Sequence, residues 1–221
     1  MTAKLQILGT SHIARESVST IRNKILDEKP DIVAVELDAS RIPYLFGKKQ
    51  RKLRLADIKQ IGLVGFIFNL IGGFIQRKLG AKVGLAPGAD IRAAIRTASK
   101  IGAKIYLIDR PIAKSLKRLS ETMTFWEKLR FIGYICGGFL LPASKELKRI
   151  DLTRVPEDQL IATLTTELNK KFPHIYNVLV RERDRHMAMK IKLLIKTYPH
   201  KKIIVVVGAG HVSGIKKHLN Y

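Results

Sequence analysis

The sequence predicts an α/β protein with a central, mostly parallel sheet that is flanked by helices. Short apolar runs that read as strands recur at 4–8, 31–38, 105–109 and 203–207. Segments with helical spacing separate these runs, as the crossover connections of parallel strands require. The runs are almost wholly apolar, which is typical of strands covered on both faces of a sheet.

The first half of the chain alternates strands and helices. After the first strand, residues 16–29 form an amphipathic pattern that Pro30 closes. The strand at 31–38 follows directly, which predicts a right-handed strand–helix–strand unit. Residues 41–80 are basic and then apolar and are expected to be helical, and 86–104 is a clear helix before the third strand.

The second half is predicted to be helical until the last strand. In the helix expected over 174–197, Ile175, Val178, Met189 and Leu193 fall on one stripe that should face inward. The strand at 203–207 must then rejoin the sheet. Length and pattern together predict a single domain over 1–221, with helical insertions at about 41–80 and 111–199.

Composition limits the function classes. The 41 basic and 18 acidic residues give a net charge of +23, which favours anionic partners. Nucleic-acid binding ranks last, because charge alone supports it and no recognition motif accompanies it. The single cysteine excludes a disulfide framework and a thiolate-rich metal site.

Two apolar segments, 61–75 and 131–142, are shorter than the roughly 20 residues that span a bilayer. They are expected to be buried helices, to form a homodimer contact, or to touch a membrane surface. With no signal peptide visible, we expect the chain in the cytoplasm or at the membrane periphery.

Each predicted strand ends in polar residues that a plain strand does not need. These are Gly9–His12, Glu36–Asp38, Asp109–Arg110 and Gly208–His211. In open α/β sheets, ligands bind outside the carboxyl ends of the strands, so these groups are expected to converge on one site. The glycines would let the backbone approach a ligand, often with positive φ.

His12, His211 and Glu36 form a ligand set that suits a divalent ion such as manganese, cobalt or zinc. Such an ion lowers the pKa of the water it binds to about 7 and so produces a nucleophile near neutral pH. The alternative is that each histidine only caps or packs. Glu36, between apolar neighbours, needs a partner in either case.

Several residues near these predicted ligands have two possible interpretations. Asp38 is either a turn residue or a helix cap, and Asp109 with Arg110 is either a simple ion pair or part of the site. On the helix at 174–197, Glu182 and His186 are expected to face inward, with Arg183 and Asp184 beside them. This group is either structural or orients the site from above.

The segments "GTSHIARESV", "PDIVAVELD", "PGADIRAAI", "GAKIYLIDRPIAKSLKR", "FWEKL", "ERDRHMA" and "VVVGAGHVSGI" resemble, in this order, the TraB/PrgY/GumN family. That family is related to Tiki-type metalloproteases and, more distantly, to ChaN and erythromycin-esterase proteins. The resemblance implies an α/β domain whose two Gly-x-x-His motifs and a glutamate form a metal-dependent site. Asp90 stands where the family pattern leads us to expect glutamate, and His186 where we expect tyrosine.

The resulting expectation is a metal-dependent hydrolase of the TraB/Tiki type that acts on a peptide or similar amide. His12 and His211 would bind the metal, and Glu36 would be a ligand or the general base. Arg183, with Arg110 as a second candidate, would neutralise charge that develops on the carbonyl oxygen. The alternative is a non-catalytic protein that sequesters a peptide or pheromone in the same crevice.

Overall fold

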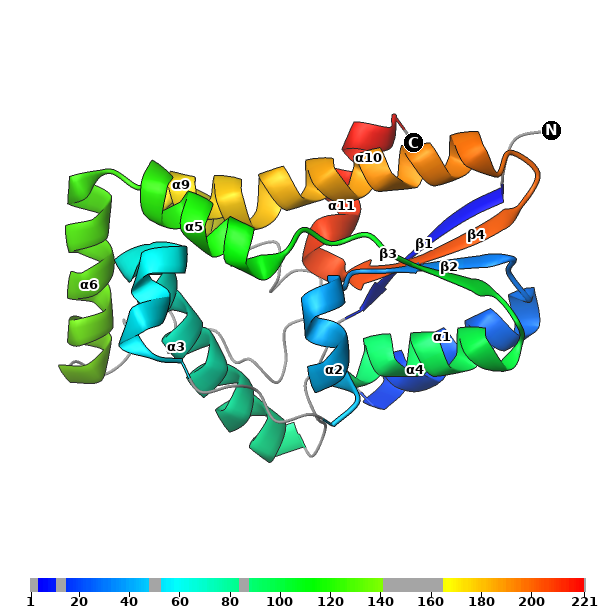
Figure 1. Cartoon of the computed structure of the whole chain (residues 1–221), viewed down its shortest axis with the longest axis horizontal. Helices are drawn as coiled ribbons and strands as arrows, with labels where there is room; N and C mark the ends of the chain where they lie inside the picture. The colour runs from blue at the N-terminus through cyan, green and yellow to red at the C-terminus, as the bar shows by residue number, and fades with distance from the viewer. Residues whose placement is uncertain (1–3, 11–14, 48–52, 84–87, 141–164, 221) are drawn as a thin grey trace.

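Four parallel strands form the centre of the molecule, as the sequence predicts. The computed structural model describes residues 4–10, 15–47, 53–83, 88–140 and 165–220. The strand order is β1-β4-β2-β3, and all three pairings are parallel (Figure 1). The strands are β1 (Lys4–Thr10), β2 (Ile32–Val35), β3 (Lys104–Leu107) and β4 (Lys202–Gly208). Because they run in one direction, their carboxyl ends share one edge of the sheet.

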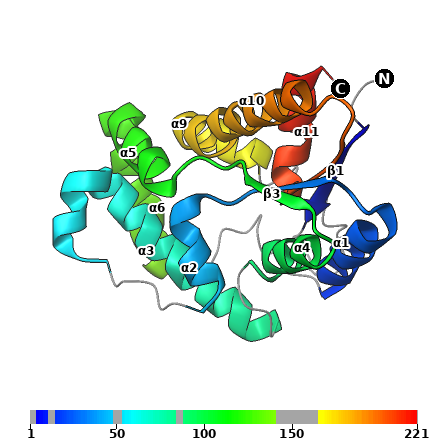
Figure 2. The same ribbon diagram turned by 45° about the vertical axis from the view of Figure 1, so that its right-hand side comes forward.

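Helices cover both faces of this sheet (Figures 1 and 2). On one face lie α1 (Arg15–Glu28) and α4 (Ala89–Lys100), and on the other lie α10 (Glu182–Thr197) and α11 (Ala209–Leu219). Successive residues of a strand point to opposite faces of the sheet: Val205 packs towards α10 and Val206 towards α4. The buried apolar runs therefore hold the sheet in a three-layer arrangement.

Further helices lie beside the sheet, whereas α10, which falls within the insertion expected at 111–199, covers one of its faces. Those beside the sheet form the helical part and are α2 (Ile42–Leu45), α3 (Ile58–Val83), α5 (Ile112–Thr122), α6 (Phe125–Leu140) and α9 (Pro173–Tyr176), with short 3₁₀ turns at Ala39–Arg41 and Leu55–Asp57. A separate apolar cluster around Leu119, Phe172 and Val178 joins α3, α5, α6 and α9, whereas Leu45 of α2 packs into the core on the α1 and α4 side of the sheet. Of the helices in the described ranges, none has the length and apolar character that crossing a bilayer requires.

The inward face predicted for the long last helix is wrong at two positions. Met189 and Leu193 are 56% and 58% exposed, whereas Met187 and Ile191 are fully buried. The cause is a π-helical turn at Asn177–Arg181, just before α10. Such a turn contains more residues than an α-helical turn, so it rotates all later side chains around the helix axis.

The expectation for the glycines after the strands also needs correction. Gly208 has φ of −59° and is the N-cap of α11, a helix that begins immediately after β4. In the described residues, glycines with positive φ occur at 47, 62, 88 and 102 and not at these strand ends. Gly9 instead allows close packing, because a Cβ there would lie 2.9 Å from Val212 Cγ2 of α11.

The shifted face of α10 can be tested with a pair of substitutions. Ile191→Ala should lower the free energy of unfolding by about 2–5 kcal/mol, because it leaves a cavity against the sheet. Leu193→Ala should change it by no more than about 0.5 kcal/mol, since that side chain is exposed. Urea denaturation measures both values, and equal losses for the two variants would contradict the observed register.

Candidate functional site

Arg183 lies at the centre of a polar cluster at the carboxyl ends of the strands. Its Nε and Nη2 donate to the two oxygens of Asp109, each over 2.9 Å. Nη2 also donates to Glu36 Oε1. Nη1 donates to the Leu179 carbonyl over 3.3 Å and contacts His211 Nε2 at 3.2 Å. All five N–H groups of the guanidinium therefore have acceptors inside the protein.

Glu36 is held from two sides. It follows β2 directly, and its side chain is 8% exposed. Oε2 accepts a 2.7 Å hydrogen bond from the backbone N–H of Gly208, and Oε1 faces Arg183 and His211. Because Gly208 caps α11, the carboxylate lies at the positive end of a helix. The expectation that Glu36 has a partner is confirmed.

His211, in the first turn of α11, is oriented by Asp184 of α10. Its Nδ1 lies 2.6 Å from Asp184 Oδ1. A guanidinium can only donate, so Nε2 accepts from Arg183 and the proton must be on Nδ1 in the neutral ring. Burial raises the pKa of Asp184, and the contact with His211 opposes this rise. The imidazole is thus fixed in one tautomer, in which Nε2 accepts from Arg183 and lies 3.4 Å from Glu36 Oε1.

The pKa of Arg183 reflects the same surroundings. Burial alone would lower the pKa of Arg183, but the carboxylates of Glu36 and Asp109 raise it by more. The pKa of Arg183 is therefore above its usual value. Three carboxylates, those of Glu36, Asp109 and Asp184, surround this one guanidinium. The cluster therefore carries excess negative charge in a chain that is otherwise strongly basic.

The structure brings together four of the residues singled out from sequence: Glu36, Arg183, Asp184 and His211. Asp109 completes the cluster through Arg183, in line with the alternative that it is part of the site and not a simple ion pair with Arg110. The signal was its position near the end of an apolar strand: Asp109 lies two residues after β3, and Glu36 directly follows β2. In the structure, Arg110 pairs instead with Glu182 of α10, its Nη1 lying 2.6 Å from Glu182 Oε2.

The other candidates lie around this cluster. Asp38 is a cap, as one of its two readings proposed, and accepts from the Ser40 backbone N–H over 2.9 Å. Asp90, in the first turn of α4, accepts from Thr10 Oγ1 at the end of β1 over 2.6 Å. Glu182 and His186 are partly exposed rather than inward, because the π-helical turn makes Asp184 the buried residue. Burial lowers the pKa of His186.

His12 lies outside the described residues, so its place relative to the cluster stays a prediction. Thr10, two residues earlier, is in register with Gly208 across β1 and β4. No group of three His, Cys, Asp or Glu side chains within the described ranges is arranged to hold a metal ion. The expected third ligand is not among the residues to which this finding applies.

The absence of a side chain at residue 214 determines how closely α11 approaches Asp184. A Cβ at Gly214 would lie 2.0 Å from Asp184 Oδ2 and 2.7 Å from its Cγ. Gly214→Ala should therefore separate the two helices, break the His211–Asp184 bond and destabilise the protein by about 1–3 kcal/mol. Thermal or urea unfolding measures this loss.

Gly133→Ala is the matched control, because a Cβ added at that helical position would meet no atom within 4 Å among the described residues outside its own helical turn. It should be neutral or stabilise the protein by up to about 1 kcal/mol. A Gly214→Ala variant as stable as this control would contradict the close approach of α11 to Asp184.

Comparison with known proteins identifies the family of this chain. The family model described as the TraB/PrgY/gumN family matches residues 2–221. An uncharacterised protein of Methanocaldococcus jannaschii is 35% identical over 97% of this chain and 53% of its own length. The human protein named TraB domain-containing protein is 27% identical over 98% of the chain and 62% of its own length. The chain thus spans between half and two thirds of these relatives, and it belongs to the TraB/PrgY/gumN family.

Proposed function

We propose that this chain is a metal-dependent hydrolase of the TraB/Tiki type that cleaves a peptide or similar amide bond. One observation carries the proposal. His211 Nε2 and Glu36 Oε1 face each other at 3.4 Å, while a carboxylate behind the ring fixes the histidine tautomer. A histidine whose other nitrogen donates to a carboxylate is the usual arrangement of a metal ligand.

The donor atoms fit a divalent ion. Ligand distances of about 2.0–2.2 Å place two ligands of one ion roughly 3–3.5 Å apart, and the Nε2–Oε1 separation is 3.4 Å. The excess of carboxylates also favours a cation. His211 and Glu36 would hold manganese, cobalt or zinc, with His12 as the proposed third ligand.

Bound there, the ion would supply the Lewis acidity that activates water near neutral pH. Gly208 holds Oε2 of Glu36, so Oε1 is the oxygen that would bind the ion or accept a proton. Asp184 acts through His211 and is a positioning residue. Arg183 orients Glu36 through Nη2 and fixes Asp109 through both carboxylate oxygens.

Arg183 would compete with a metal ion for the position between His211 and Glu36. Its guanidinium contacts both His211 Nε2 and Glu36 Oε1, the two atoms proposed as ligands. Its N–H groups all have internal acceptors, so stabilising a substrate oxygen would require it to release one. This contact favours the second candidate function, a protein that sequesters a peptide in the same crevice without metal chemistry.

Metal titration tests the proposed function. Wild-type protein should bind manganese, cobalt or zinc at about one ion per chain. Asp184→Asn should weaken this binding by about 10–100-fold, because the histidine loses its orienting carboxylate. Isothermal titration calorimetry measures the affinities, and a peptide-library cleavage assay with and without the preferred ion measures hydrolysis.

His200→Ala is the matched control, since that histidine is exposed and lies just before the start of β4, whereas the cluster lies at the other end of this strand. It should leave the affinity unchanged, whereas His12→Ala combined with His211→Ala should abolish binding. Folded protein that binds none of the three metals would refute the hydrolase proposal and favour sequestration. Binding that survives the double substitution would place the ion elsewhere.

Replacing Arg183 tests whether this residue competes with the metal ion or supports the metal ligands. Arg183→Met removes the internal cation that lies against the ligand atoms, so metal affinity should rise by at least about tenfold. Stability without metal should fall, because Glu36 and Asp109 lose their counter-charge. Calorimetry gives the affinity, and thermal unfolding with and without metal shows whether the ion restores stability.

Arg110→Met is the control for loss of a nearby positive charge. Arg110 pairs with Glu182, and both side chains are 23% exposed, so its removal should change metal affinity far less. If Arg183→Met stays folded and binds metal more weakly than wild type, Arg183 supports the ligands and does not compete with the ion.

A further inference from the structure

Helix α6 has two apolar faces, and of these only one packs against other described parts of the chain. On the inner face, Phe131 stacks on Phe68 at 6.1 Å and meets Phe172 edge-on at 5.9 Å. On the outer face, Phe125 and Trp126 are each 71% exposed, and Leu129 is 52% exposed. A helix that is apolar on both sides is normally covered on both sides.

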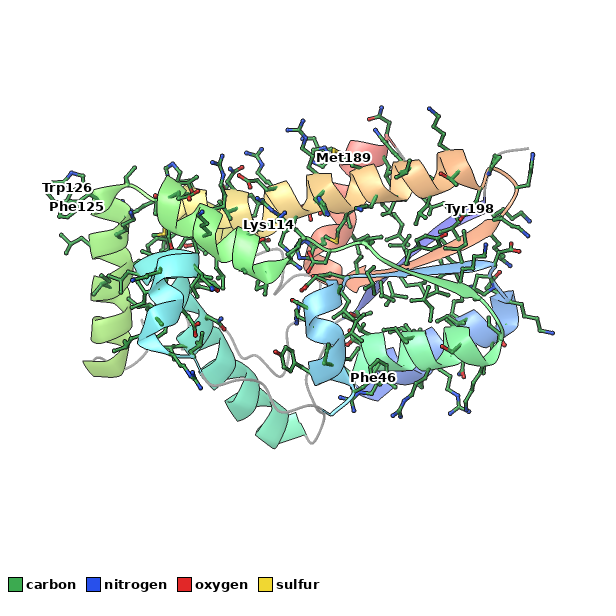
Figure 3. The ribbon with its side chains drawn as sticks, in the orientation of Figure 1. Phe46, Lys114, Phe125, Trp126, Met189 and Tyr198 are labelled. Carbon is green, nitrogen blue, oxygen red and sulfur yellow. The ribbon has the colours of Figure 1, made fainter. Side chains whose placement is uncertain are left out.

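The exposed residues gather at one end of the molecule. Figure 3 shows Phe125 and Trp126 at the start of α6, projecting away from the helical part and far from Met189 and Tyr198. Their rings are in edge-to-face contact at 5.6 Å. With Ile132, which is 37% exposed and one further turn along, they form what we call the α6 tip: Phe125, Trp126, Leu129 and Ile132.

Basic side chains lie beside this tip. Arg130 is exposed on the same helix and donates to the Lys171 carbonyl over 3.3 Å, which brings Lys170 and Lys171 close to α6. The side chains of these two lysines are 69% and 40% exposed. The acidic residue within the tip segment, Glu127, is buried and faces His174. Both lysines pair with Glu167, whose side chain is 43% exposed. Arg130, Lys170 and Lys171 still outnumber this one exposed acid, so the outward-facing charge beside the tip is mainly positive.

We propose that the α6 tip binds the surface of an anionic lipid membrane. Exposed Trp and Phe next to Arg and Lys are typical of segments that lie in the headgroup region, where apolar rings enter the boundary and cations meet lipid phosphates. A second copy of this chain fits less well, because each copy carries a net charge of +23 and basic side chains flank the tip.

Trp126 is the only tryptophan in the chain, so its fluorescence reports directly on the tip. Vesicles of equal parts phosphatidylcholine and phosphatidylglycerol should shift its emission to shorter wavelength and carry the protein upward in flotation. Vesicles of phosphatidylcholine alone should bind at least about tenfold more weakly, because the lipid charge is missing. Phe125→Ser with Leu129→Ser should cost at least about tenfold in binding to the anionic vesicles.

Met189→Ser with Leu193→Ser is the matched control, since these two α10 side chains are 56% and 58% exposed outside the tip. It should bind like wild type. An unchanged Trp126 emission with both vesicle types would overturn the proposal. Binding that is insensitive to the tip substitutions would also overturn it, as would a lipid-independent emission shift that accompanies dimer formation in analytical ultracentrifugation.

Discussion

The arrangement of the cluster depends on how the charge of Arg183 is satisfied. Its guanidinium takes acceptors from the end of β2, the end of β3 and the first turn of α11, and so ties α10 to all three. A buried charge is stable only when its partners and hydrogen bonds are complete. The positions of Glu36, Asp109 and His211 are therefore linked, and none can move without leaving part of the guanidinium or a carboxylate unpaired.

Two smaller features allow this linkage. The backbone N–H of Gly208 donates to Oε2 of Glu36, so Oε1 is available to accept from Arg183. The missing side chain at Gly214 lets α11 lie against Asp184, which then holds His211. The glycine-rich sequence after β4 thus serves close packing and a helix start. It does not serve a left-handed turn, since Gly208 has negative φ.

Sequence patterns were sufficient for the sheet and for the convergence of Glu36, Asp109 and His211 at one of its edges, because apolar strands and polar strand ends are local signals. They were insufficient where the outcome depends on contacts between distant segments. Nothing local to Asp109 shows that it binds Arg183, 74 positions away, in preference to its neighbour Arg110. The π-helical turn at Asn177–Arg181 was equally hidden, because periodicity assumes an uninterrupted α-helix. That one turn exposes Met189 and buries Asp184.

The distribution of charge connects the cluster with the surface. Seven acidic residues are buried in the described part of the chain: Glu36, Asp38, Asp57, Asp90, Asp109, Glu127 and Asp184. Since the chain has 18 acidic residues against 41 basic ones, the surface is even more positive than composition implies. Such a surface attracts anions at long range and repels free cations. A divalent ion would therefore reach the cluster against this field, and its affinity would have to come from the short-range contacts with His211 and Glu36.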